Sequence, residues 1–273
     1  MIQELDKNNY QEILNILNQS EDNIEVKSVI KGYSPGRIFV DEKKNPKTAM
    51  IWSKGIQGFY FVGDQNNNEF NDYLLSFISK KIKDILNKEN LKFFEFSGET
   101  NKWDAPLEDL FNMKELDKSQ QFIYYFNKEN WKKHNYNFIS KKYKLLKIEK
   151  NILNQKFSNI EFLLDEINLW WDNIENFLNR SSGYIVCLDD KIVSYALGNY
   201  LVDEIHLMGI ETLKEFRRKG LSQACCEAFI DNSLSNNIIP RWECMSSNIA
   251  SQKLAEKLGF KKSKVYNLYS IEI

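Results

Sequence analysis

The chain has 273 residues, which is long for one domain and sufficient for two that each bury a core. Its formal net charge of −1 at pH 7 gives no overall basic field of the kind that attracts nucleic acid. The N-terminus lacks the basic and apolar regions of a signal peptide, and no apolar run is long enough to span a membrane. We therefore expect a cytoplasmic protein with no nucleic-acid or membrane partner, and the sequence leaves its oligomeric state unknown.

The N-terminal half has the pattern of strand, strand, helix and strand. Residues 48–52 and 58–62 are rich in β-branched and aromatic side chains and flank a turn. Residues 71–86 carry apolar side chains at helical spacing, and residues 91–96 are typical of a further strand. The turn at 63–69 is acidic and polar, so we expect no phosphate-binding loop before this helix.

The middle of the chain is not a flexible linker, because it is rich in Lys, Asn and Tyr and poor in Gly and Pro. Residues 121–126 and 143–148 are typical of strands that complete the first domain. The pattern predicts an N-terminal α+β domain at 1–135 and a second domain at 136–273.

The most informative feature is the turn at 217–222, with the sequence RRKGLS, which follows a strand-like run at 204–212. From Leu221 onward, apolar residues recur with helical spacing. The first N–H groups of a helix have no partner within it and bind anions readily. Gly220 lets the backbone approach a ligand closely, and Ser222 is small enough to allow it. The sequence therefore predicts a site for a pyrophosphate group.

A second motif follows a predicted strand at 240–244. Ser246, Ser247 or Asn248 can cap the helix that comes next, and Gly259 occupies the position of a left-handed C-terminal cap.

These two motifs resemble those of the GNAT N-acetyltransferase superfamily. Its acyl-CoA loop has the pattern Arg/Gln-x-x-Gly-x-Gly/Ala, which Arg217, Gly220 and Ser222 match with Ser in the last place. The second motif resembles the GNAT helix that packs beside the pantetheine arm. The resemblance implies an α/β fold with a mixed central sheet, in which a splayed pair of strands admits acetyl-CoA.

The short sequences at 210–212 and 242–244, close to the two motifs, are similar to those of a bacterial branch of proteins that have a C-terminal GNAT domain. This branch includes relatives of antibiotic self-resistance acetyltransferases. The resemblance covers about residues 162–273. We expect the N-terminal half to be either a degenerate copy of the same fold or an unrelated α+β lid.

The resemblance also implies the cofactor and its contacts. We expect acetyl-CoA as the cofactor and direct transfer of its acetyl group to a primary amine of a small molecule, without a covalent enzyme intermediate. The cofactor-binding residues implied are Ile210, Glu211, Thr212, Arg217, Arg218, Lys219, Gly220, Leu221, Ser222, Gln223, Asn248 and Ser251.

The attacking amine must lose a proton, so a general base is expected on the cofactor-binding strand. Some GNAT relatives place a catalytic Glu or His about six residues before the position of Thr212, and His206 stands there. Its imidazole suits proton transfer near neutral pH, although a hydrogen-bonded strand residue without a catalytic role is the alternative. Glu204 is the second candidate and Glu211 the third, and Glu243 on the next strand is a further option.

One residue departs from the family pattern. Many GNAT enzymes have a Tyr two residues before Lys257 that protonates the leaving thiolate, whereas this chain has Ala255. The proton then comes from another group or from solvent, or the domain is a non-catalytic acyl-CoA-binding module. A third hypothesis, a Fem-like transferase that uses aminoacyl-tRNA, is disfavoured by the intact acyl-CoA loop. The four cysteines lack metal-ligand spacing, so we expect free thiols and no metal site.

Overall fold

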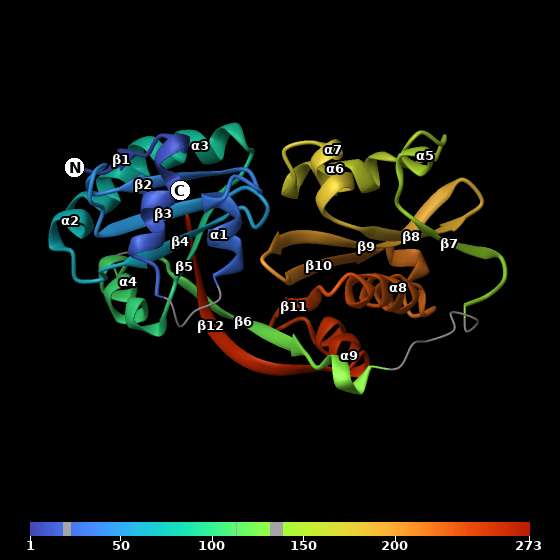
Figure 1. Ribbon diagram of the computed structural model, residues 1–273. Coiled ribbons are helices and arrows are strands. Elements are labelled where there is room, and N and C mark those ends of the chain that lie inside the picture. Colours follow the sequence, from blue (N-terminus) through green and yellow to red (C-terminus); the bar gives the residue numbers. More distant parts are fainter. Residues whose placement is uncertain (19–22, 113, 132–138) are drawn as a thin grey trace. The chain divides into compact units, whose positions relative to one another are not determined.

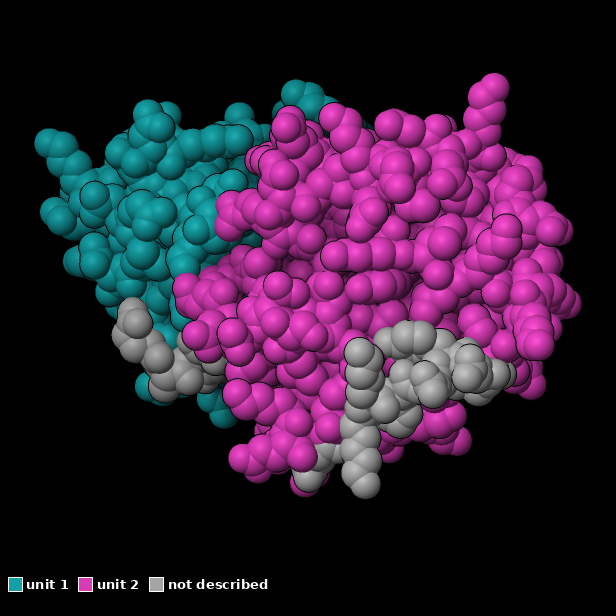
Figure 2. All heavy atoms as spheres, turned by 45° about the vertical axis from the view of Figure 1, so that its right-hand side comes forward, with its two compact units in different colours: residues 1–121, 265–273 teal, residues 122–264 magenta. Residues whose placement is uncertain are grey.

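The computed structural model describes residues 1–18, 23–112, 114–131 and 139–273 of the chain (Figure 1). It divides into two compact units, coloured separately in Figure 2. Unit 1 comprises residues 1–121 and 265–273, and unit 2 comprises residues 122–264. The expected boundary between residues 135 and 136 lies outside the described residues, so that boundary stays a prediction.

Unit 1 is built on a sheet in the order β1-β2-β3-β4-β5-β12, which confirms the expected α/β class. β2, β3 and β4 pair antiparallel, whereas β4 and β5 are parallel. The helix expected at 71–86 is present as two α-helices joined by a π-helical turn at Ile78–Ile82. These two helices are α2 (Asn68–Phe77) and α3 (Lys83–Lys88). The other elements are β1 (Gln3–Glu4), α1 (Ile24–Ile30), β2 (Gly36–Val40), β3 (Thr48–Ser53), β4 (Gly58–Gly63), β5 (Phe93–Gly98) and α4 (Asp104–Leu110).

Aromatic side chains fill the core of unit 1. Phe61, Phe96 and Trp103 are buried, and the rings of Phe61 and Trp103 lie 5.5 Å apart. A Cβ atom on Gly98 would collide with the Trp103 side chain, so this position of β5 has no room for a side chain.

Unit 2 has the strand order β6-β11-β10-β9-β8-β7, with helices on both faces of its sheet (Figure 1). Alternate residues of β8 and β9 face opposite ways, as the pleat requires. Val186 and Ala196 pack with α8, whereas Ile185 and Leu197 pack with α6. The elements are β6 (Asp117–Phe126), β7 (Tyr143–Lys147), α5 (Lys150–Leu153), α6 (Glu161–Trp170), α7 (Ile174–Arg180), β8 (Gly183–Leu188), β9 (Lys191–Val202), β10 (Ile205–Thr212), α8 (Leu221–Ser235), β11 (Ile239–Met245), α9 (Ile249–Lys257) and β12 (Phe260–Glu272).

The two halves of the chain exchange their final strands. β12 follows α9 of unit 2, but its residues from Val265 onward belong to unit 1. There Tyr269 and Ile271 pair with Phe96 and Phe94 of β5. β6 follows α4 of unit 1, and its residues from Phe122 onward belong to unit 2, where the strand neighbours β11.

The same order of elements occurs in both units. In unit 1 the parallel strands β4 and β5 are joined through α2 and α3 and are followed by α4. In unit 2 the parallel strands β10 and β11 are joined through α8 and are followed by α9. This repetition supports a degenerate copy of one fold in the N-terminal half over an unrelated lid. Within the described residues, no helix combines the length and apolarity needed to cross a membrane.

Tyr269 tests the contribution of the exchanged strand to unit 1. Its ring is fully buried against Phe96, with the centroids 5.5 Å apart, and its hydroxyl donates to Glu108 Oε1 at 2.7 Å. We expect Tyr269→Ala to lower the free energy of unfolding by about 3–5 kcal/mol, because a large buried ring is lost and leaves a cavity. Denaturant titration measures this loss. Tyr73→Ala, at a side chain that is 48% exposed, is the control and should change stability by less than about 0.5 kcal/mol.

Candidate functional site

The site lies where two parallel strands separate. β10 and β11 pair only over Ile205–Leu207 and Ile239–Arg241, and then run on apart to Thr212 and Met245. The other edge of β10 stays paired with β9 along its full length. The polar backbone groups of β10 between Met208 and Ile210 are therefore available on one side to a ligand that lies between the strands.

The expected phosphate loop leads from β10 to the N-terminus of α8. Arg218 and Gly220 both adopt left-handed backbone conformations, with φ of 61° and 75°. α8 begins at Leu221 without a side-chain cap, and its hydrogen bonding starts with the Ala224 amide donating to the Gly220 carbonyl. The first amides of α8 are thus free to bind an anion, and the helix dipole favours negative charge there.

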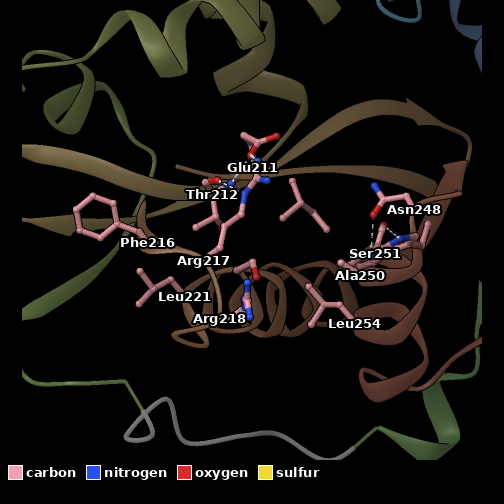
Figure 3. Close-up of a pocket in the computed structure, with 13 residues that line it drawn as sticks. Glu211, Thr212, Phe216, Arg217, Arg218, Leu221, Asn248, Ala250, Ser251 and Leu254 are labelled. Carbon is pink, nitrogen blue, oxygen red and sulfur yellow. Dashed lines mark hydrogen bonds and ion pairs between the residues drawn. The ribbon is translucent and has the colours of Figure 1, made fainter. Parts of the chain in front are cut away.

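The basic side chains of this loop point in different directions. Arg217 donates to the Thr212 carbonyl and to Glu211 Oε1, both at 3.0 Å (Figure 3). Lys219 turns outward, where its Nζ donates to a main-chain carbonyl at 2.8 Å and lies over the Phe216 ring. No partner among the described residues holds the exposed Arg218 guanidinium, which lines the cavity. Arg218 is therefore the cation of this loop that is most available to a ligand.

The second motif forms the opposite wall. Asn248 caps α9, because its Oδ1 accepts from the Ser251 amide at 3.1 Å. Ser251 Oγ accepts from Trp242 Nε1 at 3.0 Å, which fixes the start of α9 against β11. Gly259, with φ of 90°, ends this helix in the expected left-handed conformation.

These elements enclose a cavity of about 430 Å³ (Figure 3). Expected cofactor residues that line it are Ile210, Glu211, Thr212, Arg217, Arg218, Leu221, Ser222, Asn248 and Ser251. Lys219, Gly220 and Gln223 do not line it, and the Gln223 side chain is engaged by Glu227 and Lys257, each at 2.7 Å.

The sequence analysis did not name the apolar part of the wall, which consists of Phe216, Trp242, Ala250 and Leu254. The i, i+4 spacing of Ala250 and Leu254 on α9 was a usable signal. Ala255, at the position of the family's Tyr, is fully buried in the core of unit 2 and does not line the cavity.

His206 is not placed in the cavity, which corrects the leading expectation for a general base. Its side chain is 1% exposed, and its ring packs against Phe229 of α8 with the centroids 4.9 Å apart. The His206 Nε2 atom lies 2.9 Å from Ser181 Oγ. Burial lowers the pKa of His206 to about 3, so the imidazole is neutral at pH 7. The strand alternation was read correctly, but this face of β10 is closed by α8.

The acidic candidates for the general base also differ in whether they line the cavity. Glu204 is exposed in the turn before β10, and the distance along the strand from it to Ile210, six positions further on, is roughly 20 Å. Glu243 is buried in an ion pair with Arg241 at 2.8 Å and does not line the cavity. Of the expected bases, the structure brings only Glu211 to the cofactor loop.

The buried His206 gives stability a defined pH dependence. Because its pKa is lower in the folded state, its contribution is complete above pH about 6.5 and is lost as the pH falls towards 3. We expect the wild type to lose about 2 kcal/mol more than His206→Gln between pH 7 and pH 5, at about 1.4 kcal/mol per pH unit below 6.5. Urea titrations of both proteins at the two pH values measure the difference. Equal losses would contradict the neutral, buried state of His206.

Comparisons with known proteins agree with this geometry. The family model described as GNAT acetyltransferase matches residues 14–269, which include elements of both units. The chain is 26% identical over 270 residues to the uncharacterized N-acetyltransferase YdfB of Bacillus subtilis, covering 98% of each protein. It is 28% identical over 103 residues to the ribosomal protein bS18-alanine N-acetyltransferase of Salmonella typhimurium, which covers 36% of this chain and 70% of that enzyme.

Solved structures share the fold over the full length. A GCN5-related N-acetyltransferase-like protein from Streptococcus suis superimposes with a TM-score of 0.66 at 18% identity, covering 97% of this chain and 99% of its own. A tandem GNAT protein from the clavulanic acid biosynthesis pathway gives a TM-score of 0.61 at 9% identity, covering 100% and 98%. The match over residues 14–269, together with the splayed strands and their loop, shows that the chain belongs to the GNAT acetyltransferase family.

Proposed function

We propose that this N-acetyltransferase binds acetyl-CoA between β10 and β11 and transfers the acetyl group to a primary amine of a small molecule. The observation that carries the proposal is the uncapped N-terminus of α8, which faces the gap between the strands. A helix start without a side-chain cap leaves several amides unsatisfied unless an anion or water binds them. In unit 1 the corresponding helix α2 is closed by its own cap, since Asn67 accepts from the Phe70 amide at 3.1 Å.

The residues present fit such a cofactor. The amides at the start of α8 and the Arg218 guanidinium provide donors and positive charge for a pyrophosphate. The free edge of β10 at Ile210 offers amide and carbonyl groups to the peptide-like pantetheine arm. Trp242 and Leu254 give that slot an apolar wall.

The chemistry requires few protein groups. Bound acetyl-CoA supplies an acetyl thioester, and the protein has to orient it, exclude water and remove a proton from the amine. An alkylamine with a pKa near 10.4 is neutral in only about one molecule in a few thousand at pH 7, so a base in the site speeds the reaction. Glu211 lines the cavity and carries a negative charge next to it.

An acyl-CoA-binding module without catalysis is the second candidate. Two observations favour it: Ala255 stands where many relatives have a proton-donating Tyr, and His206 is shut away from the cavity. Release of free thiol from acetyl-CoA in the presence of a panel of amines distinguishes the two functions, because only the enzyme raises the rate above hydrolysis.

Gly220→Asp tests the cofactor loop. The new carboxylate adds bulk and negative charge where the pyrophosphate would lie, so we expect calorimetry to show loss of CoA binding with an unchanged far-UV circular dichroism spectrum. Gly32→Asp is a matched control, because Gly32 also has a left-handed φ, of 68°, and an added Cβ there would meet nothing within 4 Å. Unchanged CoA affinity in Gly220→Asp would refute the proposed pyrophosphate site.

Arg218→Ala tests the exposed guanidinium that lines the cavity. Loss of a charge-assisted hydrogen bond should raise the Kd for CoA by about tenfold to a hundredfold. Lys219→Ala is the comparison, since its ammonium is turned outward to a main-chain carbonyl and should change the Kd by less than about threefold. An equal effect of the two substitutions would show that only net charge matters, and not the placement of Arg218.

A further inference from the structure

The two faces of β10 differ beyond the point where it leaves β11. Met208 and Ile210 pack towards α8, whereas Gly209 and Glu211 lie on the opposite face. On the neighbouring strand β9, Leu197 is the partner of Gly209 and Tyr195 the partner of Glu211. Leu197 and Tyr195 pack under α6, so this is the face of the sheet that α6 covers.

Two carboxylates meet on this face around Tyr195. Glu166 on α6 accepts from Trp170 Nε1 at 2.7 Å and from the Tyr195 hydroxyl. Cross-strand partners in an antiparallel pair have Cβ atoms about 4.5–5.5 Å apart, which puts Glu211 next to Tyr195. Burial raises the pKa of Glu166, and the charge of Glu211 adds to the effect. A carboxylate with a raised pKa is a better proton acceptor than an exposed one.

A buried side-chain amide on the same face has a carbonyl oxygen without a partner among the described residues. Asn199 is the extra residue of a bulge in β9, since Leu207 pairs with Tyr200 and the next residue, Met208, pairs with Gly198. The Asn199 side chain is 4% exposed, and no hydrogen-bond partner for its Oδ1 exists among the described residues. A buried polar atom without a partner costs stability, so its retention calls for an explanation.

The position of the Asn199 amide supplies an explanation for its retention. A Cβ atom on Gly209 would lie 2.6 Å from Asn199 Oδ1, so the amide extends from β9 over the backbone of β10. It reaches over β10 just past Leu207, where β10 begins to leave β11. Gly209 provides the space for this reach, because any side chain there would collide with the amide.

We propose that Glu166, Asn199 and Glu211 form the acceptor site, and that it takes a primary amine which is a cation with no carboxylate of its own. This inference rests on the proposed function, because it assumes an acetyl thioester between β10 and β11. Glu211 is held by Arg217 and by the Thr212 amide, and the Arg217 guanidinium balances its charge. Asn199 Oδ1 accepts a hydrogen bond from the ammonium group, and Glu166 is the general base.

The proposed step balances as follows. The ammonium group gives one proton to the Glu166 carboxylate, and the free amine forms a bond to the acetyl carbon as the carbon–sulfur bond breaks. The sulfur leaves with the electron pair and is protonated to the thiol. The amine nitrogen loses its second proton and becomes an amide, so the net release is one proton to solvent.

A length-matched set of amines tests the substrate class. We measure CoA affinity by calorimetry and thiol release from acetyl-CoA with 1,6-diaminohexane, hexylamine and 6-aminohexanoate, which differ only in the far end. We expect kcat/KM for 6-aminohexanoate to be about tenfold or more below the values for the two amines that carry no carboxylate. If CoA does not bind, the proposed function fails; if CoA binds but 6-aminohexanoate reacts as well as the other two, or none of the three amines reacts, the acceptor site is refuted.

Substitutions test the residues. Glu166→Gln should lower kcat for 1,6-diaminohexane by about 10²–10⁴-fold with CoA affinity unchanged, as expected for loss of a general base. Asp165→Asn, at an exposed neighbour on α6, is the control and should keep full activity. Asn199→Leu should raise KM for the amine while the melting temperature stays the same or rises, because an unpartnered amide is removed. A lower melting temperature with unchanged KM would assign Asn199 a structural role, and a loss below threefold in Glu166→Gln would exclude it as the base.

Discussion

The separation of β10 from β11 is the constraint on which the site depends. Two parallel strands that stay paired along their length satisfy the hydrogen-bonding groups of each other's backbone. β10 and β11 do so over only three residues of each strand. The free edge of β10 then needs another partner, and the elements that follow each strand supply the walls of a slot for it. The loop into α8 and the uncapped start of that helix lie at one end of the slot, and α9 provides the apolar side. The two faces of β10 meet different neighbours, with Met208 and Ile210 towards α8 and Gly209 and Glu211 on the face that α6 covers.

Much of this arrangement was predictable because it depends on local chemistry. The strand, the basic turn with Gly220 and the helix start at Leu221 are contiguous in sequence, and their hydrogen-bonding needs are fixed by backbone geometry. The cap at Asn248 and the left-handed Gly259 follow from side-chain and backbone preferences of single residues. For the same reason the strands expected at 48–52, 58–62 and 91–96 and the long helix of unit 1 agree with the structure to within about three residues. The expectation that strands at 121–126 and 143–148 complete the first domain is wrong, because residues 122–126 belong to unit 2 and β7 pairs with β8 there.

The rest depends on contacts between distant segments, which periodicity does not encode. His206 lies on the expected face of β10, but Ser181 and Phe229 close that face, and neither is near it in sequence. The bulge that contains Asn199 belongs to β9, and the period-2 alternation of β10 does not reveal it. The pattern gives no sign of a role for Glu166, because an acidic residue on an amphipathic helix is usually on its exposed side. The exchange of β6 and β12 involves pairings across more than a hundred residues, beyond the reach of any local pattern.

The exchange has a consequence for biosynthesis. The sheet of unit 1 is completed by β12, whose pairing residues with β5 are Tyr269 to Glu272. A ribosome makes the rest of unit 1 first, then all of unit 2, and only then the strand that covers the edge of β5. During that interval the growing chain exposes an unpaired strand edge next to a large aromatic cluster, which is a template for aggregation. Completion of the sheet of unit 1 is therefore coupled to synthesis of β12, because it requires a pairing with very high sequence separation.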